Sequence, residues 1–240
     1  MRKWFVFMLF MFFTACASSP VDMSKSAEEA YQKAQRIMEL EEYGRAILDL
    51  EKFSSKYPYS RFATPAELMR LEAAYLDGQY ILSETLGLRF VDAHPDDEKR
   101  VYAQYLVAMS YYKQSYSAKL DQQFSHRSRD AFLDLNQQFP VNDYSQDIQK
   151  YLTILTNRVA EHEVIVGKFY WDKKRYVAAT NRFLYVKNKY ATADVTAEAL
   201  FYLVQSYQAL QQFAQAREIE SLLKSDFSQS EWAGKAALLM

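Results

Sequence analysis

Glycine, proline and cysteine are scarce in this chain. Five glycines, five prolines and one cysteine occur among 240 residues, and tight hairpins and phosphate-binding loops depend on the first two. A β-sandwich, a β-barrel and a glycine-rich nucleotide-binding fold are therefore disfavoured. Hydrophobic residues make up 50% of the chain and charged residues 25%, which is typical of a globular protein rather than a disordered one. The composition favours an all-α fold.

The chain also lacks an excess of positive charge. Its 29 Lys and Arg are balanced by 30 Asp and Glu, so counterion release from a phosphate backbone could not drive binding. Nucleic acid is not expected as a partner.

Motifs that carry catalysis are missing as well. The sequence has no G-x-S-x-G, no phosphate-binding loop and no H-E-x-x-H. The three histidines, His94, His126 and His162, are scattered, and the neighbours of His162 on a helix point in different directions. We expect a protein that is not an enzyme and that holds neither a cofactor nor a metal.

The first residues are typical of an export signal. Arg2 and Lys3 precede the apolar run from Trp4 to Phe13, which is far shorter than the ~20 residues that span a bilayer. The four residues ending in Cys16 (FTAC) resemble the lipobox of bacterial lipoproteins, where the chain is cut before a cysteine that carries acyl chains. An ordinary signal peptide with an incidental cysteine is the alternative.

These features predict a lipid-anchored protein. Residues 1–15 would be the signal peptide, and residues 16–25 a lipidated, flexible tether that begins at Cys16. In enterobacterial-type sorting, an Asp directly after the lipidated Cys retains a lipoprotein at the inner membrane. This chain has Ala17 at that position, which resembles the signal of lipoproteins sent to the outer membrane.

The rest of the chain repeats one pattern of small and aromatic residues. In its clearest unit, small residues allow two helices to approach closely and aromatic rings fill the remaining space. That unit consists of Gly167, Tyr170, Tyr176, Ala179, Phe183, Val186 and Tyr190. Similar units begin near Ala34 and Val204, and two more end at His94-Pro95 and Phe139-Pro140.

Five helix pairs result, and they resemble tetratricopeptide repeats. We predict an all-α, tetratricopeptide-like solenoid with repeats one to three in residues 26–145 and repeats four and five in 146–240. The stretches Tyr112–Ser128 and Gln146–Glu163 are interpreted as insertions, the second as an extended helix. A generic helical bundle is the alternative.

A stacked solenoid exposes a concave surface that binds peptides rather than processing them. Aromatic residues near its N-terminal end are candidates for such a groove, although each could equally be an ordinary packing residue. The candidates are Tyr57, Tyr59, Phe62 and Tyr75.

Three longer stretches carry a resemblance to a known family. They are Ala46–Ser60 (AILDLEKFSSKYPYS), Arg129–Tyr144 (RDAFLDLNQQFPVNDY) and Asn157–Tyr170 (NRVAEHEVIVGKFY). With the lipobox, they make the chain similar to the BamD (ComL/YfiO) family, lipoproteins of the outer-membrane β-barrel assembly (BAM) machinery.

The resemblance implies a scaffold on the periplasmic face of the outer membrane. Its C-terminal repeats would dock on the periplasmic domains of BamA, beside other BAM lipoproteins, and its N-terminal repeats would receive signal segments of unfolded outer-membrane proteins. The family's partner-binding Asn-Arg pair corresponds to Asn181 and Arg182. A surface ion pair within the repeat is the alternative role for Arg182.

The chain departs from the family pattern in three places. Phe13 replaces the usual Leu of the lipobox, the third-repeat insertion is shorter than is common in the family, and the fourth repeat ends in Tyr190-Ala191 rather than Tyr-Pro. A second hypothesis for function is therefore kept: another tetratricopeptide lipoprotein that acts as an adaptor for peptidoglycan enzymes or an envelope division complex.

Overall fold

The described part of the chain is entirely helical. A computed structural model describes residues 23–237 and contains no strand there. Its eleven helices are α1 (Met23–Glu39), α2 (Tyr43–Lys56), α3 (Ala63–Leu76), α4 (Tyr80–Ala93), α5 (Arg100–Gln114), α6 (Gln123–Gln138), α7 (Ser145–Asp172), α8 (Tyr176–Lys189), α9 (Thr196–Ala209), α10 (Phe213–Asp226) and α11 (Glu231–Ala237). The predicted all-α class is confirmed.

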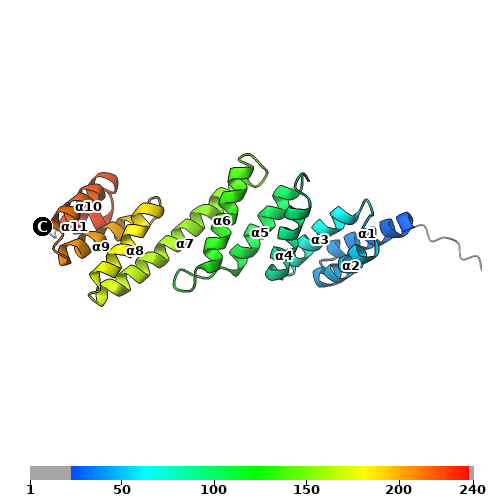
Figure 1. Ribbon diagram of the computed structural model, residues 1–240, viewed down its shortest axis with the longest axis horizontal. Helices are drawn as coiled ribbons and strands as arrows, with labels where there is room; N and C mark the ends of the chain where they lie inside the picture. The colour runs from blue at the N-terminus through cyan, green and yellow to red at the C-terminus, as the bar shows by residue number, and fades with distance from the viewer. Residues whose placement is uncertain (1–22, 238–240) are drawn as a thin grey trace, which may run out of the picture.

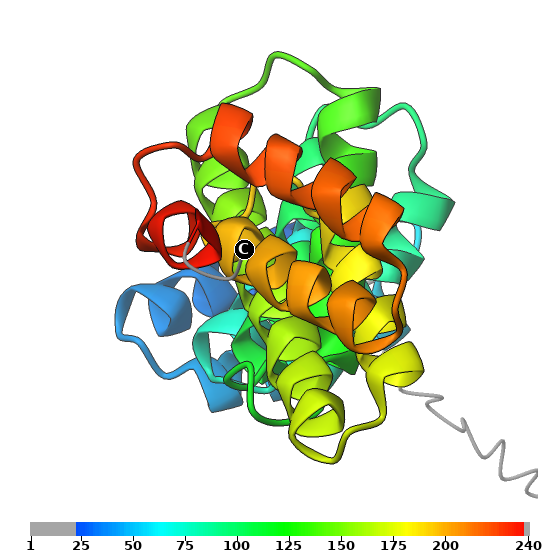
Figure 2. The ribbon, with the colours of Figure 1, turned by 90° about the vertical axis from the view of Figure 1, so that its left-hand side faces the viewer.

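The helices form five consecutive pairs, closed by the short α11. Each helix packs mainly against its neighbours in sequence, from α1 on α2 through α9 on α10. Figure 1 shows the pairs in a row along the long axis, with α1 at one end and α11 at the other. In the end view of Figure 2 the pairs lie one behind another. This arrangement is the stacked solenoid that the repeat pattern predicted.

Four of the five pairs turn in the same way. One residue of the turn adopts a left-handed backbone conformation, with φ of 58°, 77°, 58° and 60° at Glu41, Gly78, Lys174 and Gln211. The next backbone N–H then donates to a carbonyl of the preceding helix, as Arg175 does to Tyr170 at 2.9 Å. The third pair differs, because residues 115–122 form a longer connection between α5 and α6, in agreement with the insertion expected there.

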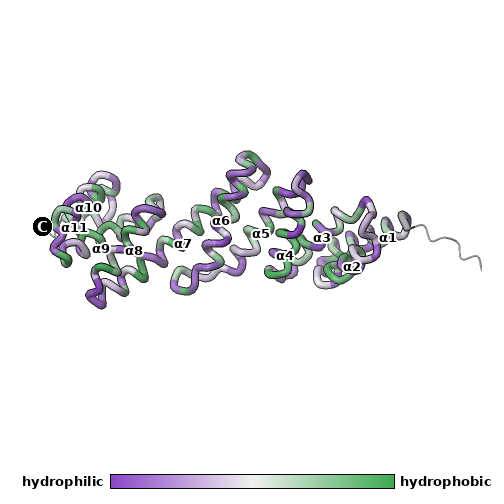
Figure 3. Tube along the Cα trace, in the orientation of Figure 1, coloured by the Kyte–Doolittle hydropathy of each residue, from purple (hydrophilic) through white to green (hydrophobic). Residues whose placement is uncertain are grey.

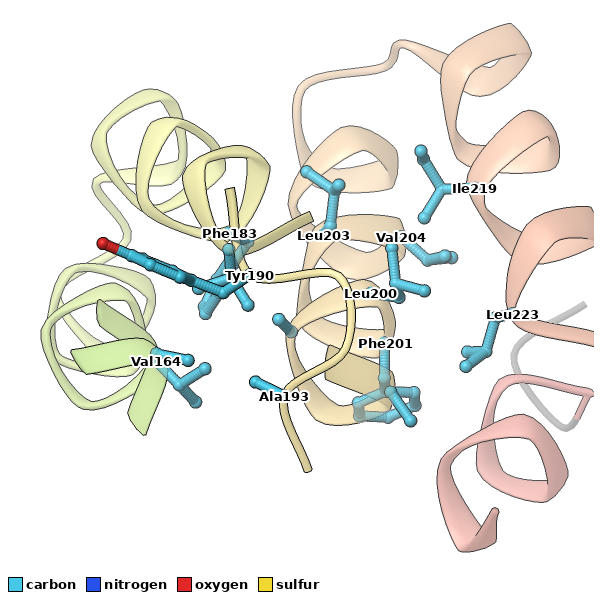
Figure 4. Close-up of a cluster of buried hydrophobic side chains, with 14 of the residues drawn as sticks. Val164, Phe183, Tyr190, Ala193, Leu200, Phe201, Leu203, Val204, Ile219 and Leu223 are labelled. Atoms are coloured by element: carbon cyan, nitrogen blue, oxygen red, sulfur yellow. The ribbon is translucent and has the colours of Figure 1, made fainter. Parts of the chain in front are cut away.

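The steric logic of the repeat is visible between α7 and α8. A Cβ atom added to Gly167 would lie 2.5 Å from Cε1 of Phe183, so only glycine fits there without a shift. Phe183 and Ala179 are fully buried. Figure 4 shows the Tyr190 ring pointing back between the helices of its own pair, while Leu200 and Leu203 lie on α9 of the next pair. Small residues and rings therefore pack as predicted.

The long helix α7 joins two parts of the core. It is continuous over 28 residues, so the stretch Gln146–Glu163 is not a separate insertion but the first part of the fourth pair's leading helix. Its Ile148 and Leu155 pack with α5 and α6, whereas its Val159 and Val164 pack with α8 and α9. A third core cluster covers α1 to α5.

Each helix carries both polar and apolar residues along its length, as the mixed colours in Figure 3 show. Among the residues that the structure describes, no helix has the length and hydropathy needed to cross a membrane. The first helix begins at Met23, which places residues 23–25, predicted as tether, inside α1.

Candidate functional site

Arg182 lies on the surface of α8 and forms an ion pair across the fourth helix pair. Its Nη1 donates to Oε2 of Glu163 at 2.9 Å. The Glu163 residue on α7 is only 7% exposed, whereas the Arg182 side chain is 44% exposed. The buried carboxylate therefore fixes the guanidinium while leaving part of it open to solvent.

A hollow of about 500 Å³ surrounds this guanidinium. We call it the Arg182 hollow, and its lining consists of Tyr170, Arg175, Ala178, Asn181, Arg182 and Tyr185. Two arginines and no carboxylate contribute to that lining, so it favours a partner that presents negative charge. Val177 and Phe169, which are 63% and 57% exposed, lie on the same two helices. Exposed apolar side chains close to arginine are typical of a protein interface.

One wall of the hollow is held by buried aromatic contacts. The ring of Tyr185 packs edge-on against Tyr190, with centroids 5.6 Å apart. Burial raises the pKa of Tyr190 far above its ordinary value, and a hydrogen bond with Tyr185 adds to the effect. The guanidinium of Arg129 on α6 lies 5.5 Å from the Tyr190 ring. The third repeat thus supports the surface of the fourth.

The sequence placed Asn181 and Arg182 on this surface but missed the rest of the hollow. Tyr170 was interpreted as a packing residue, yet it lines the hollow while also packing on the core. A signal was present, because Ala178, Asn181, Arg182 and Tyr185 are spaced to share one face of a helix. Glu163 reaches the site from another helix, which spacing within α8 could not reveal.

The four groove candidates do not lie together. Tyr57 is buried against Phe53, with ring centroids 5.2 Å apart, whereas Tyr59 is 100% exposed. Phe62 is partly buried and stacks on Tyr31 of α1 at 5.0 Å. Tyr57 and Tyr59 line a hollow of about 620 Å³ with Lys56 and Arg61. Of these candidates, Tyr59 has the most freely accessible ring.

Tyr75 belongs to a different place, which we call the tyrosine cluster. The cluster gathers half-buried tyrosines of α3, α5 and the start of α7, namely Tyr75, Tyr102, Tyr105, Tyr144 and Tyr151. Within it the Tyr144 ring stacks on Tyr105 at 4.5 Å and on Tyr102 at 5.7 Å. Burial raises the pKa of Tyr75 to about 12. The predicted groove residues therefore occupy two surfaces rather than one.

The remaining candidates concern anchoring and metal binding. Cys16 lies outside the described residues. Within residues 23–237 no group of His, Cys, Asp and Glu has a geometry suited to a metal ion. His94 pairs with Glu67 at 3.0 Å and His162 contacts the carbonyl oxygen of Ala118 at 2.7 Å, so both take part in contacts between structural elements.

Comparison with known proteins decides the family. A family model described as YfiO, outer membrane lipoprotein, matches residues 23–222. The chain belongs to the YfiO family. This result confirms the family resemblance that the sequence motifs indicated.

Several relatives of this YfiO family chain are named outer membrane protein assembly factor BamD. The protein from Rickettsia prowazekii is 30% identical over 210 residues, which cover 88% of this chain and 84% of the relative. The proteins from Caulobacter vibrioides and Neisseria gonorrhoeae are 27% and 26% identical, covering 79% and 90% of this chain and 62% and 85% of their own lengths.

Among solved structures, one of nearly identical TPR-like repeats of a kinesin light chain from Podospora anserina is similar, with a TM-score of 0.39 and 12% identity. That similarity covers 87% of this YfiO family chain and 99% of the other chain.

Proposed function

We propose that this YfiO family chain is a lipid-anchored scaffold of the outer-membrane β-barrel assembly complex, on the periplasmic face of the outer membrane. Cys16 carries the acyl anchor, the C-terminal repeats dock on BamA beside other BAM lipoproteins, and the N-terminal repeats receive segments of unfolded outer-membrane proteins. The function is binding, with no reaction at any step. Membership of the family, whose relatives are named assembly factors, is the observation that carries the proposal.

The Arg182 hollow supports the docking part of the proposal. Its arginines and tyrosines are residue types that are enriched at protein interfaces, where a partly desolvated guanidinium binds carboxylates in a fixed geometry. Glu163 holds Arg182 in place before a partner arrives, which reduces the side-chain entropy lost on binding. BamA would present a carboxylate to Arg182 and a hydrogen-bonding group to Asn181.

The test is co-purification from detergent-solubilised envelopes with the full chain as bait. We expect recovery of a large β-barrel protein with periplasmic repeats. Arg182→Glu should reduce that recovery about tenfold, because it places a carboxylate opposite a carboxylate. The mass of the mature N-terminus, measured in the same preparation, shows whether Cys16 is acylated.

Two control variants separate docking from folding. Arg217→Glu makes the same charge reversal at an exposed position of α10 outside the hollow, and should leave recovery unchanged. The double variant Glu163→Gln, Arg182→Gln removes both charges of the ion pair, so it should fold yet still lose the partner.

Two outcomes would contradict the proposal. Equal recovery with wild type and Arg182→Glu would remove Arg182 from the interface and leave only its internal ion pair. Recovery of cell-wall hydrolases or division proteins, without any β-barrel protein, would favour the adaptor function instead.

A further inference from the structure

A cleft opens on the N-terminal repeats, apart from both hollows described above. It lies between α1, the start of α3 and the connection from α4 to α5, and has a volume of about 390 Å³. We call it the Tyr31 cleft. Tyr31, Leu68 and Met69 form its apolar wall, and the buried ring of Phe90 lies beneath them.

The cleft lies where the first and third helices do not pack along each other. Among the described helices α1 packs along α2, whereas α3 packs along α2, α4 and α5. The ring of Phe62, at the start of α3, stacks on Tyr31 at 5.0 Å with an interplanar angle of 19°. Burial raises the pKa of the Tyr31 phenol. A stacking contact therefore holds the Tyr31 ring in place at the wall of the cleft.

The rim of the cleft is negatively charged. It carries the carboxylates of Glu72, Asp97 and Glu98 and one ammonium group, that of Lys99. The Lys99 ammonium lies 3.6 Å from Glu98 and offsets one of these charges, so the rim keeps a net negative charge. Glu72 accepts a hydrogen bond from the Tyr102 hydroxyl at 2.9 Å. Asp97 accepts one from the backbone N–H of Lys99 at 2.7 Å. Both carboxylates are thus held in position and keep an oxygen available.

The tyrosine cluster extends this surface toward the middle of the solenoid. Tyr102, which binds Glu72, stacks on Tyr144, and Tyr144 stacks on Tyr105. The Tyr105 hydroxyl lies 3.4 Å from Oδ2 of Asp147 on α7. A run of three stacked rings, with a carboxylate at each end, therefore leads from the cleft onto α5 and α7. This combination suits a cation, which is attracted both to ring faces and to carboxylates.

We propose that the Tyr31 cleft and the adjoining tyrosine cluster bind an extended segment of an unfolded polypeptide that carries a Lys or Arg next to an aromatic or apolar residue. The apolar side chain lies against Leu68 and Met69, and the cation lies against Glu72, Asp97 and Glu98. Charge complementarity identifies this occupant. The inference rests on the proposed function, in which the N-terminal repeats receive unfolded chains, and adds the chemistry that they select.

The test compares two labelled peptides by fluorescence anisotropy with the full chain. Both alternate Ser and Phe, and one has a central Arg where the other has Glu. We expect the Arg peptide to bind at least tenfold more tightly at low ionic strength, and salt to reduce the difference.

A charge-neutral variant of the cleft shows where the selectivity arises. Glu72→Gln, Asp97→Asn and Glu98→Gln together preserve side-chain size and the two hydrogen bonds, and should lower the preference for the Arg peptide to less than threefold. The matched control neutralises three exposed carboxylates outside the cleft, through Glu39→Gln, Glu41→Gln and Asp92→Asn. This control should retain the preference, and circular dichroism should show equal helicity for all three proteins.

Photocrosslinking locates the peptide. A benzoylphenylalanine in place of Met69 should crosslink to the Arg peptide, whereas the same residue in place of the exposed Leu48 on α2 should not.

In the binding experiment, equal binding of the two peptides or tighter binding of the Glu peptide would overturn the proposal, as would a preference for Arg that survives neutralisation of the cleft. Crosslinking at Leu48 rather than Met69 would also overturn it. So would a molecular mass that rises with concentration, because a second copy of the chain would then occupy the cleft. The co-purification described above is independent of these results. If the neutralised variant still recovers the β-barrel partner while neither protein prefers Arg, the cleft inference fails and the scaffold function stands.

Discussion

The first two helix pairs (α1–α4) of the N-terminal repeats and the last two pairs (α7–α10) share one packing template but present opposite charges. The Tyr31 cleft has a rim of carboxylates, whereas the Arg182 hollow has arginines and no carboxylate. The template fixes only the side chains that point between helices, so the outward positions of each hairpin vary independently. A single repeat architecture can therefore carry two binding surfaces of different chemistry.

Two ion pairs between neighbouring helices differ in which charge is the more buried. Between α2 and α3 the cation is the more buried partner, since the side chains of Arg70 and Glu51 are 11% and 55% exposed. Between α7 and α8 the anion is the more buried partner, as Glu163 and Arg182 show. In the second pair the exposed partner, Arg182, lines the adjoining hollow. Packing and surface chemistry are thus connected through side chains that cross between helices.

The largest expected effect comes from truncating one core ring at a time. Phe183→Ala in the C-terminal repeats and Phe90→Ala in the N-terminal repeats each remove a fully buried ring, which costs about 3–5 kcal/mol. Because repeats interact mainly with their neighbours, each change should reduce hydrogen-exchange protection most in its own region. A uniform loss along all helices in both variants would instead show a single cooperative unit.

A smaller effect is expected from the ion pair beneath the Arg182 hollow. Arg182→Gln leaves the buried Glu163 carboxylate without its cation and should destabilise the chain by about 1 kcal/mol, a value lowered by the partial exposure of Arg182. Adding Glu163→Gln should recover most of this loss in urea unfolding. Glu51→Gln is the counterpart in the N-terminal repeats. If the double variant is less stable than Arg182→Gln, the two side chains are not coupled as described.

The last effect appears only at alkaline pH. Burial raises the pKa of Tyr75 from an ordinary value of 10.0 to about 12, and burial also raises the pKa values of Tyr102 and Tyr105. A phenol whose pKa is higher in the folded state contributes stability that is complete below pH 10 and is lost as the pH rises to the folded value. The urea midpoint should therefore fall between pH 10 and pH 12. Tyr75→Phe should fall less steeply, and an unchanged slope would exclude Tyr75 as a contributor.

Sequence alone predicted the repeating core well, because steric rules fix it. Gly167 and Phe183 form a complementary pair whose spacing along two helices is visible in the sequence, and Ala46 and Ala179 are fully buried as expected of the small positions. The extended helix predicted over Gln146–Glu163, bridging the third and fourth units, is confirmed as the first part of α7. Its interpretation as an insertion was wrong, since the pattern of one repeat overlaps that of the next within this helix.

The sites were predicted less well than the core. Asn181 and Arg182 were placed off the buried stripe, as the structure has them. The groove candidates were grouped by sequence proximity, yet Tyr57 is buried, Phe62 stacks on Tyr31, and Tyr75 joins residues of α5 and α7. Contacts across helices, such as Glu163 with Arg182, depend on how the hairpins stack, which local periodicity does not specify.

The continuous α7 also determines how the two binding surfaces can cooperate. A helix of 28 residues measures about 42 Å at ~1.5 Å per residue, and it has no proline and no break along that length. A helix without proline or interruption keeps the tyrosine cluster near its start and the Arg182 hollow near its end in a fixed relation. In the proposed scaffold, a polypeptide passing from one end to the other would therefore move along a surface of constant geometry.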